Sequence, residues 1–295
     1  NLTSVDDQVL FEGTSSVTAT SGNVTVTSDS FGGSDGQITM QDGSVINSGS
    51  GLITLDAEGD ALLTSLITTT EVRASSITGS ILDNDVVDDA DITAATVSLR
   101  ALSGVGTDGN SVETVSDGTT TTLVLSALTD SGDIHVSNTG ALIVGTVNGL
   151  SGVEISDSTA GGDDSGADHI TVSAAGSITV NQSLSNSDGG GISQIATEDI
   201  VVSAPVDTNG GSIVFNSDSD QATTPGGGMI VTSDVTSGGG DIILGGGADP
   251  TVSSAIGTAA TLDGISISGA TLSASSGSIS VLGSSSVGDG VALLS

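Results

Sequence analysis

The densest group of ionisable side chains in this sequence is the segment DNDVVDDAD at residues 83–91. Hard cations such as calcium are bound by several carboxylate and carbonyl oxygens, and this segment is rich in carboxylates. The candidate metal ligands are Asp83, Asp85, Asp88, Asp89 and Asp91. The segment lacks the glycine and the terminal glutamate of an EF-hand loop, so a solvated acidic loop is the alternative interpretation. Calcium is the only cofactor that the sequence suggests.

Residues suited to acid–base chemistry are scarce. His135 and His169 are the only histidines, and each stands beside an isoleucine in a strand-like alternation. This pattern predicts that both histidines point outward, and neither has a second His or Cys beside it to complete a metal site. Arg73 and Arg100 are the only side chains that could supply the base of a polysaccharide lyase, and there is no Trp or Tyr on which a sugar could stack. We therefore predict no catalytic residue, with a carbohydrate-active enzyme as the alternative.

The net charge excludes several classes of partner. The chain carries 36 acidic residues and two arginines, for a formal charge of −34. A protein without a basic stripe does not bind nucleic acid, and an anionic membrane surface would repel it. No apolar run approaches the roughly 20 residues that a membrane-spanning helix needs. We therefore predict neither nucleic-acid binding nor membrane insertion.

The elements that must position these residues are short strands that recur along the chain. Residues 176–247 contain three passes of one pattern, and its first strands begin at Ile178, Ile200 and Ile230, which are 22 and 30 residues apart. The larger step contains a polar insertion at residues 216–227 that we expect to loop out. The later apolar positions of the three passes are Leu184, Val206 and Val235, then Ile192, Ile213 and Ile242. A self-similar unit of this length is typical of a solenoid.

Alternation within the unit predicts strands rather than helices. Ile178, Val180, Ile213 and Phe215 fall on every second position and should point inward. One such unit cannot bury its apolar side alone, whereas stacked units bury a continuous aliphatic column. At about 20–30 residues per rung, the sequence predicts an all-β parallel β-helix, or β-solenoid, of roughly a dozen irregular rungs.

The domain organisation follows from the same pattern. No change in composition marks a boundary, so we predict one elongated domain over residues 1–295. Residues 61–122 alternate less cleanly and are expected to form irregular rungs or loops, with a short helical turn at residues 62–67. Residues 1–21 are expected to form a cap or a first rung. Neither terminus contains an amphipathic helix that could cap the solenoid, and open strand edges favour self-association through these ends.

Several segments resemble a known family. GSITVNQSLSNSDGGGIS (176–193), DIVVSAPVDTNGGSIVF (199–215) and ITMQDGSVINSGSGLITLDAEGD (38–60) are similar to the repeats of filamentous-haemagglutinin-like adhesins and other giant bacterial surface proteins. The resemblance implies a right-handed parallel β-helix that is extracellular or lies on the bacterial cell surface. It implies a role in adhesion or surface structure, and it carries over no catalytic residue.

These observations lead to one hypothesis and two alternatives. The hypothesis is a non-enzymatic extracellular structural protein, either an adhesin shaft or the protomer of a self-assembling filament or sheet. Its expected partners are further copies of itself and cell-surface or matrix carbohydrate. The alternatives are a carbohydrate-active β-helix enzyme and a calcium-dependent binding module of a giant adhesin.

Overall fold

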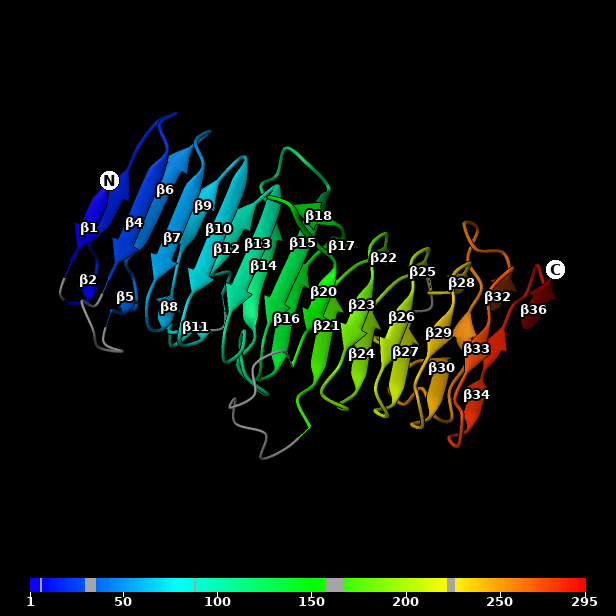
Figure 1. The fold of residues 1–295 in the computed structure, drawn as a ribbon. Helices are drawn as coiled ribbons and strands as arrows, with labels where there is room; N and C mark the ends of the chain where they lie inside the picture. Colours follow the sequence, from blue (N-terminus) through cyan, green and yellow to red (C-terminus); the bar gives the residue numbers. More distant parts are fainter. Residues whose placement is uncertain (6, 30–35, 88, 158–166, 222–225) are drawn as a thin grey trace.

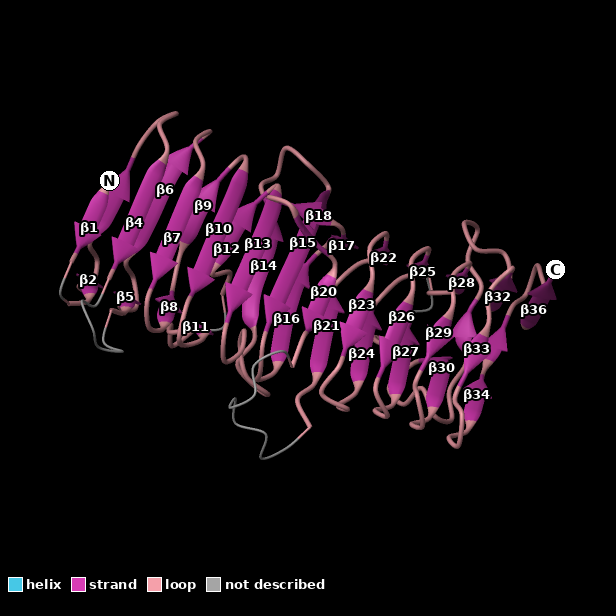
Figure 2. Ribbon diagram, viewed as in Figure 1, coloured by secondary structure: helices cyan, strands magenta, loops and turns pink. Residues whose placement is uncertain are grey.

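The structure is a computed structural model that describes residues 1–5, 7–29, 36–87, 89–157, 167–221 and 226–295. Every regular element in this part of the chain is a β-strand, and the rest is loop (Figure 2). The strands wind into an elongated coil with the two termini at opposite ends (Figure 1). Strands of successive turns pair in parallel, so the predicted all-β parallel β-helix is confirmed.

Three parallel sheets run along the coil, and we number them sheets 1, 2 and 3. Sheet 1 contains β1 (Leu2–Ser4), β4 (Val24–Ser28), β7 (Ile53–Ala57), β10 (Glu71–Ser76), β13 (Thr96–Ala101), β15 (Thr122–Thr129), β17 (Ala141–Val144), β20 (Val153–Ile155), β22 (Ile178–Val180), β23 (Leu184–Asn186), β25 (Ile200–Val202), β26 (Val206–Thr208), β28 (Met229–Val231), β29 (Val235–Thr236), β32 (Ile265–Ser268), β33 (Leu272–Ser273) and β36 (Val291–Leu294). Sheet 2 contains β3 (Ser16–Thr18), β6 (Val45–Gly49), β9 (Leu66–Thr68), β12 (Ile92–Ala94), β14 (Val112–Ser116), β16 (Ile134–Thr139), β21 (Ile170–Ala174), β24 (Ile192–Ala196), β27 (Ile213–Ser217), β30 (Ile242–Gly246) and β34 (Ile279–Val281). Sheet 3 is short and contains β2 (Val9–Phe11), β5 (Ile38–Met40), β8 (Ala61–Leu63) and β11 (Ile81–Asp83).

Two small pairs complete the described strands. β18 (Thr146–Val147) and β19 (Leu150–Ser151) form an antiparallel hairpin, whereas β31 (Ala255–Ile256) and β35 (Gly283–Ser284) pair in parallel. A typical early rung passes through β4, β5 and β6 before β7 begins the next one. Sheet 1 runs from β1 to β36 through about a dozen such passes, which agrees with the repeat length in the sequence.

The core is a column of aliphatic side chains along the axis of the coil. Ile178, Ile200, Met229 and Ile265 are paired in successive rungs, and all four are fully buried. Each such side chain contributes about 1.5–3 kcal/mol when it leaves water. A register slip of one residue would turn the whole column outward, so this burial fixes the stacking. The predicted inward residues in the other strands are buried as well.

The third pass of the repeat corrects one prediction. The strand that pairs with Ile200 begins at Met229, so Met229 enters the core and Ile230 points outward. The sequence pattern had placed an isoleucine at each first position. The pattern was built on isoleucine and so passed over Met229. A methionine nevertheless fits this core position, because its unbranched thioether chain adapts to irregular space.

The predicted helical turn at residues 62–67 is wrong, because this segment forms β8 and β9. Leu62 and Ile67 are half-buried outward positions, while Leu63 and Leu66 point into the core. Because both faces of these strands carry apolar residues, the sequence shows no alternation of apolar and polar residues here. β8 to β13 all pair in the regular stack. The rung after β13 is irregular from Gly104 on, where Val105 makes single bridges to Ile81 and Ile134.

The cross-section of the coil changes near β15. Before this strand, sheet 1 contributes one strand to each rung and the opposite side contributes two, from sheets 3 and 2. After it, sheet 1 contributes two short strands, such as β22 and β23, and sheet 2 contributes one. β15 spans both patterns, because it pairs with β13 on one edge and with β17 and β20 on the other. Sheet 3 ends at β11, just before this change, and the acidic segment of the sequence follows directly.

Candidate metal centre

The first acidic side chain of the site occupies an inward position that is apolar in the preceding rungs. Asp83 is the last residue of β11 and pairs with Leu63 of β8. In the earlier rungs the last residues of β5 and β2 are Met40 and Phe11, and both are buried. Asp83 is 8 % exposed, so its carboxylate lies on the inward side of the coil. The strand alternation therefore directs a charged group toward the interior.

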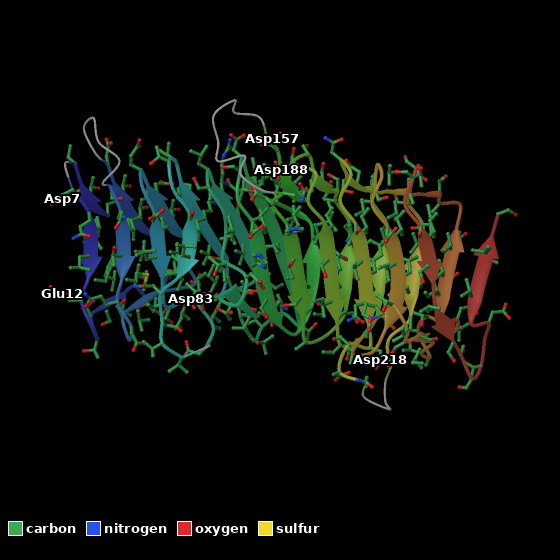
Figure 3. The ribbon with its side chains drawn as sticks, turned by 90° about the horizontal axis from the view of Figure 1, so that it is seen from below. Asp7, Glu12, Asp83, Asp157, Asp188 and Asp218 are labelled. Carbon is green, nitrogen blue, oxygen red and sulfur yellow. The ribbon has the colours of Figure 1, made fainter. Side chains whose placement is uncertain are left out.

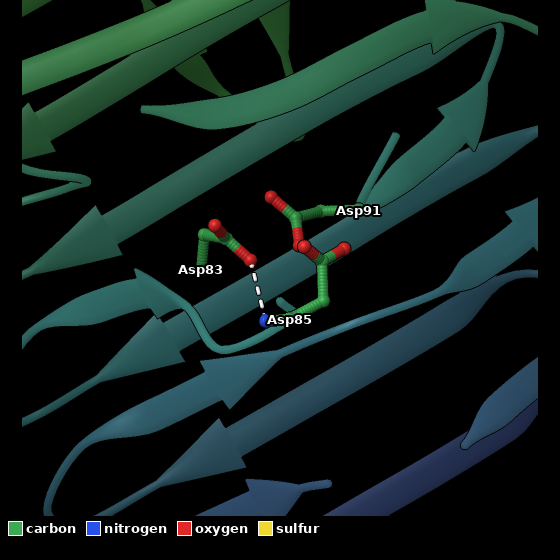
Figure 4. A group of neighbouring side chains, drawn as sticks. All are labelled: Asp83, Asp85 and Asp91. Carbon is green, nitrogen blue, oxygen red and sulfur yellow. Dashed lines mark hydrogen bonds between the residues drawn. The ribbon is translucent and has the colours of Figure 1, made fainter. Parts of the chain in front are cut away.

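Asp85 and Asp91 bring two more carboxylates to this point. Asp85 follows in the loop after β11, and its backbone N–H donates to Asp83 Oδ1 at 2.8 Å. Asp91 immediately precedes β12 and is 0 % exposed. One oxygen from each of the three carboxylates lies within 4.8 Å of the others. Figure 4 shows the three side chains pointing toward one another from the loop and the two strand ends.

Backbone contacts fix the position of Asp91. Its Oδ2 accepts a hydrogen bond from the backbone N–H of Glu113 at 2.9 Å, and its own carbonyl accepts one from Leu66 N–H at 2.7 Å. Its Oδ1 is buried and has no hydrogen-bond partner in the described part of the chain. A buried oxygen without a partner is costly, so this atom is available to accept a proton or to bind a cation.

The other two predicted ligands have different outcomes. Asp89 lies beside Asp85, and both line a hollow of about 190 Å³ together with Asp42 and Thr64. Asp88 lies outside the described residues. Within the described part of the segment, Asp83 and Asp91 are buried, Asp85 is half-buried and Asp89 is exposed, so the alternative of a solvated loop applies to only part of it. In Figure 3, Asp83 lies at the edge of the coil opposite Asp157 and Asp188, so the site is separate from the acidic residues of that edge.

The electrostatics of the site disfavour three free carboxylates. Burial raises the pKa of Asp91 to about 9; the Glu113 N–H opposes this shift, and the charges of Asp83, Glu113 and Asp85 add to it. The pKa of Asp85 rises to about 7, first through desolvation and then through a hydrogen bond with Asp89 and nearby negative charge. The sequence has no lysine to compensate. Arg73 is already paired with Glu71, with Nε and Oε1 2.7 Å apart.

The two histidines lie on the outer side of the coil as predicted, but only one of them is exposed. Parallel pairing of β16 with β21 brings them to one groove of about 510 Å³, together with Asp108 and Asp133. His169 is exposed as predicted, and its Nδ1 accepts a hydrogen bond from Gly191 N–H at 2.9 Å. His135 is only 7 % exposed, because the irregular segment beyond Gly104 covers it. Its Nε2 lies 3.5 Å from Asp133 Oδ2. Only the rung register could have revealed this neighbourhood.

The two arginines also share a groove. Arg73 and Arg100 line a hollow of about 480 Å³ on the outer face of sheet 1, beneath the hairpin β18–β19. β10 pairs with β13 so that Ser75 stands opposite Arg100, which places the two arginines diagonally on adjacent strands. Arg73 is held by Glu71, whereas Arg100 is exposed. This groove is the place where the alternative of a carbohydrate ligand can be examined.

Comparison with known proteins gives no relative from which a role could be transferred. No family model matches the chain, and neither a curated protein nor a solved structure does. Among the described residues, no helix is long and apolar enough to cross a membrane.

Proposed function

We propose that this protein is a non-enzymatic, extracellular structural rod, the shaft of an adhesin or the protomer of a filament or sheet. The observation that supports the proposal is the continuous parallel ladder of sheet 1 from β1 to β36 around a buried aliphatic column. Such a ladder resists bending and stretching because every rung hydrogen-bonds to the next. The acidic surface keeps the strands of different molecules from pairing at random. The extracellular part of the proposal comes from the sequence resemblance of several segments to the repeats of surface adhesins.

Self-association would use the terminal rungs. Ile279 and Leu293 continue the inward rows of Ile242 and Ile267, yet they are 47 % and 75 % exposed. In the part of the chain that the structure describes, β36 pairs with β32 along one edge only and exposes Leu293 beside the other. A strand edge of this kind pairs readily with another chain, and we propose that the opposite terminal rung of a second copy covers it.

Electron microscopy and sedimentation velocity across a range of concentrations test this contact. We expect end-to-end oligomers that lengthen with concentration, and Leu293→Asp should return them to single rods. The matched control is Val287→Asp, because Val287 is equally exposed but belongs to no strand. If the unaltered protein formed single rods at every concentration, the hypothesis of a filament protomer would be excluded and the hypothesis of an adhesin shaft would remain.

A second candidate function is recognition or cleavage of a cell-surface or matrix carbohydrate in the arginine groove. The observation that favours it is that both arginines of a strongly acidic chain line one hollow. Arg100 would contact a sugar carboxylate, since an arginine fork matches that group. Binding of oligogalacturonate, with a reducing-end assay in parallel, tests this candidate. Arg100→Gln should abolish binding, and Asp207→Asn on the same outer face should not.

A further inference from the structure

We propose that Asp83, Asp85 and Asp91 bind one hard divalent cation, with calcium the preferred ion, which ties the end of β11 to the start of β12. This site is independent of the terminal rungs and of the arginine groove. It holds whether the rod serves as a shaft or as a filament protomer.

The spacing of the carboxylates fits one ion. Calcium lies about 2.3–2.6 Å from its oxygen ligands, so two ligands on opposite sides of an ion are separated by roughly twice that distance. The three carboxylates each place an oxygen within 4.8 Å of the others. This spacing is compatible with one shared calcium ion. Magnesium needs a strict octahedron at about 2.0–2.1 Å and gives up its water reluctantly, whereas calcium accepts six to eight oxygens in flexible geometry, so a site with three carboxylates favours calcium.

The second observation is the unpartnered Oδ1 of Asp91. This side chain is 0 % exposed, Oδ2 is held by Glu113 N–H, Oδ1 has no partner in the described residues, and the carboxylate points toward those of Asp83 and Asp85 (Figure 4). An acidic loop formed by chance would direct its carboxylates to water. Here the chain directs one into the interior and leaves an oxygen without a donor.

No side chain of the protein supplies the missing positive charge. There is no lysine, Arg73 is paired with Glu71, and Arg100 faces the groove beneath the hairpin β18–β19. Buried carboxylates need a partner charge or a proton. A divalent ion would satisfy all three groups at once, and the hollow beside Asp85 and Asp89 leaves room for the water ligands that complete six to eight oxygens.

The site occupies a junction of the fold. Sheet 3 ends at β11, and the next rung returns through the single bridge of Val105 rather than a full strand. Asp91 also contacts β14 through Glu113. A bound ion would therefore replace, at this point, the interstrand hydrogen bonds that the missing strand does not provide.

Isothermal titration calorimetry with calcium and with magnesium tests the site, with 0.15 M NaCl present to screen the diffuse acidic surface. Terbium luminescence with direct excitation is the second readout, since the chain has no Trp or Tyr to sensitise it. We expect one calcium site per chain that binds magnesium more weakly. Asp91→Asn and Asp83→Asn should each weaken calcium binding by about tenfold or more. The exposed Asp207→Asn is the matched control and should bind as the unaltered protein does.

Folding of the variants is followed separately. Circular dichroism in EDTA should show that Asp91→Asn keeps its β-structure, because the asparagine retains an oxygen for Glu113 N–H. Thermal unfolding of the unaltered protein should shift upward in calcium, and that of both variants should shift less at the same calcium concentration. Equal calcium affinity and stoichiometry in the variants and the control would overturn the proposal, as would the absence of a saturable site at millimolar calcium.

Discussion

The effect of Asp83→Leu on the free energy of unfolding should change sign when calcium is present. Asp83 occupies an inward position in the row of Phe11, Met40 and Leu63. Burying a leucine there contributes about 1.5–3 kcal/mol, and the hydrogen bond from Asp85 N–H that is lost contributes about 1 kcal/mol. Removing one of three crowded negative charges adds to the gain. In EDTA, Asp83→Leu should therefore be more stable than the unaltered protein by about 1–3 kcal/mol, as seen when other buried ionic groups are replaced by apolar ones.

Calcium should invert this order. An ion at one thousand times its dissociation constant stabilises the folded state by about 4.1 kcal/mol, which exceeds the gain from leucine, and only the unaltered protein would receive this contribution. The assay is urea unfolding followed by far-ultraviolet circular dichroism, in EDTA and in saturating calcium. Asp83→Asn separates the effects, because it removes the charge without filling the core.

Two results would refute this reasoning. If Asp83→Leu were destabilised in EDTA as strongly as Leu63→Ala, the position would not tolerate an apolar side chain, and its place in the aliphatic row would be wrong. If calcium stabilised Asp83→Leu as much as the unaltered protein, the ion would be bound elsewhere.

Three further predictions concern the rest of the coil. Ile200→Ala should lower the free energy of unfolding in urea by about 2–5 kcal/mol, whereas the outward Ile230→Ala should cost far less; equal losses would contradict the observed register. Gly152 and Gly149 have similar positive φ angles of 82° and 79°, but a Cβ on Gly152 would lie 2.1 Å from a backbone oxygen and one on Gly149 would meet nothing within 4 Å. Thermal unfolding should therefore show a much larger loss for Gly152→Ala than for Gly149→Ala, and similar losses would mean that only the backbone angle matters. Burial raises the pKa of Asp199, against the hydrogen bonds that it accepts. The folded state thus holds this proton more tightly, so the contribution of Asp199 to stability falls as the pH rises from the ordinary Asp pKa of about 3.9 through the raised value. Asp199→Asn should flatten that part of the urea-midpoint profile, and an unchanged slope would refute the assignment.

The strand pattern was predictable because burial alone determines it. Ile178 and Phe215 are inward in the sequence pattern and buried in the structure. The pattern failed where two adjacent residues are both apolar, as at Met229 and Ile230, because the alternation then does not show which of the two points inward. It failed again at residues 62–67, where leucines on both faces of two short strands imitate a helical period.

The acidic site was predictable only in part. The sequence shows how many carboxylates lie close along the chain, but not which of them turn inward. Asp83 and Asp85 are two residues apart, whereas Asp91 arrives at the start of another strand and belongs to the site only because the rung folds back. The neighbourhood of His135 and His169 likewise depends on the stacking of β16 on β21. Local patterns predict strands well, whereas contacts between rungs require the register.

The acidic site also differs from the way the coil distributes charge elsewhere. In a parallel coil, equivalent positions stack about 4.8 Å apart, so like charges in adjacent rungs would repel. One outward row of sheet 1 runs through Thr27, Asp56, Ser75, Arg100, Leu128, Glu154, Ser185, Asp207 and Thr236. Its three acidic residues never stand opposite one another, because serine, arginine and leucine separate them. Asp83, Asp85 and Asp91 have no such separation, and Asp83 and Asp91 are buried. In the proposed site, a cation would take the place of the neutral spacer that separates the acidic residues of this row.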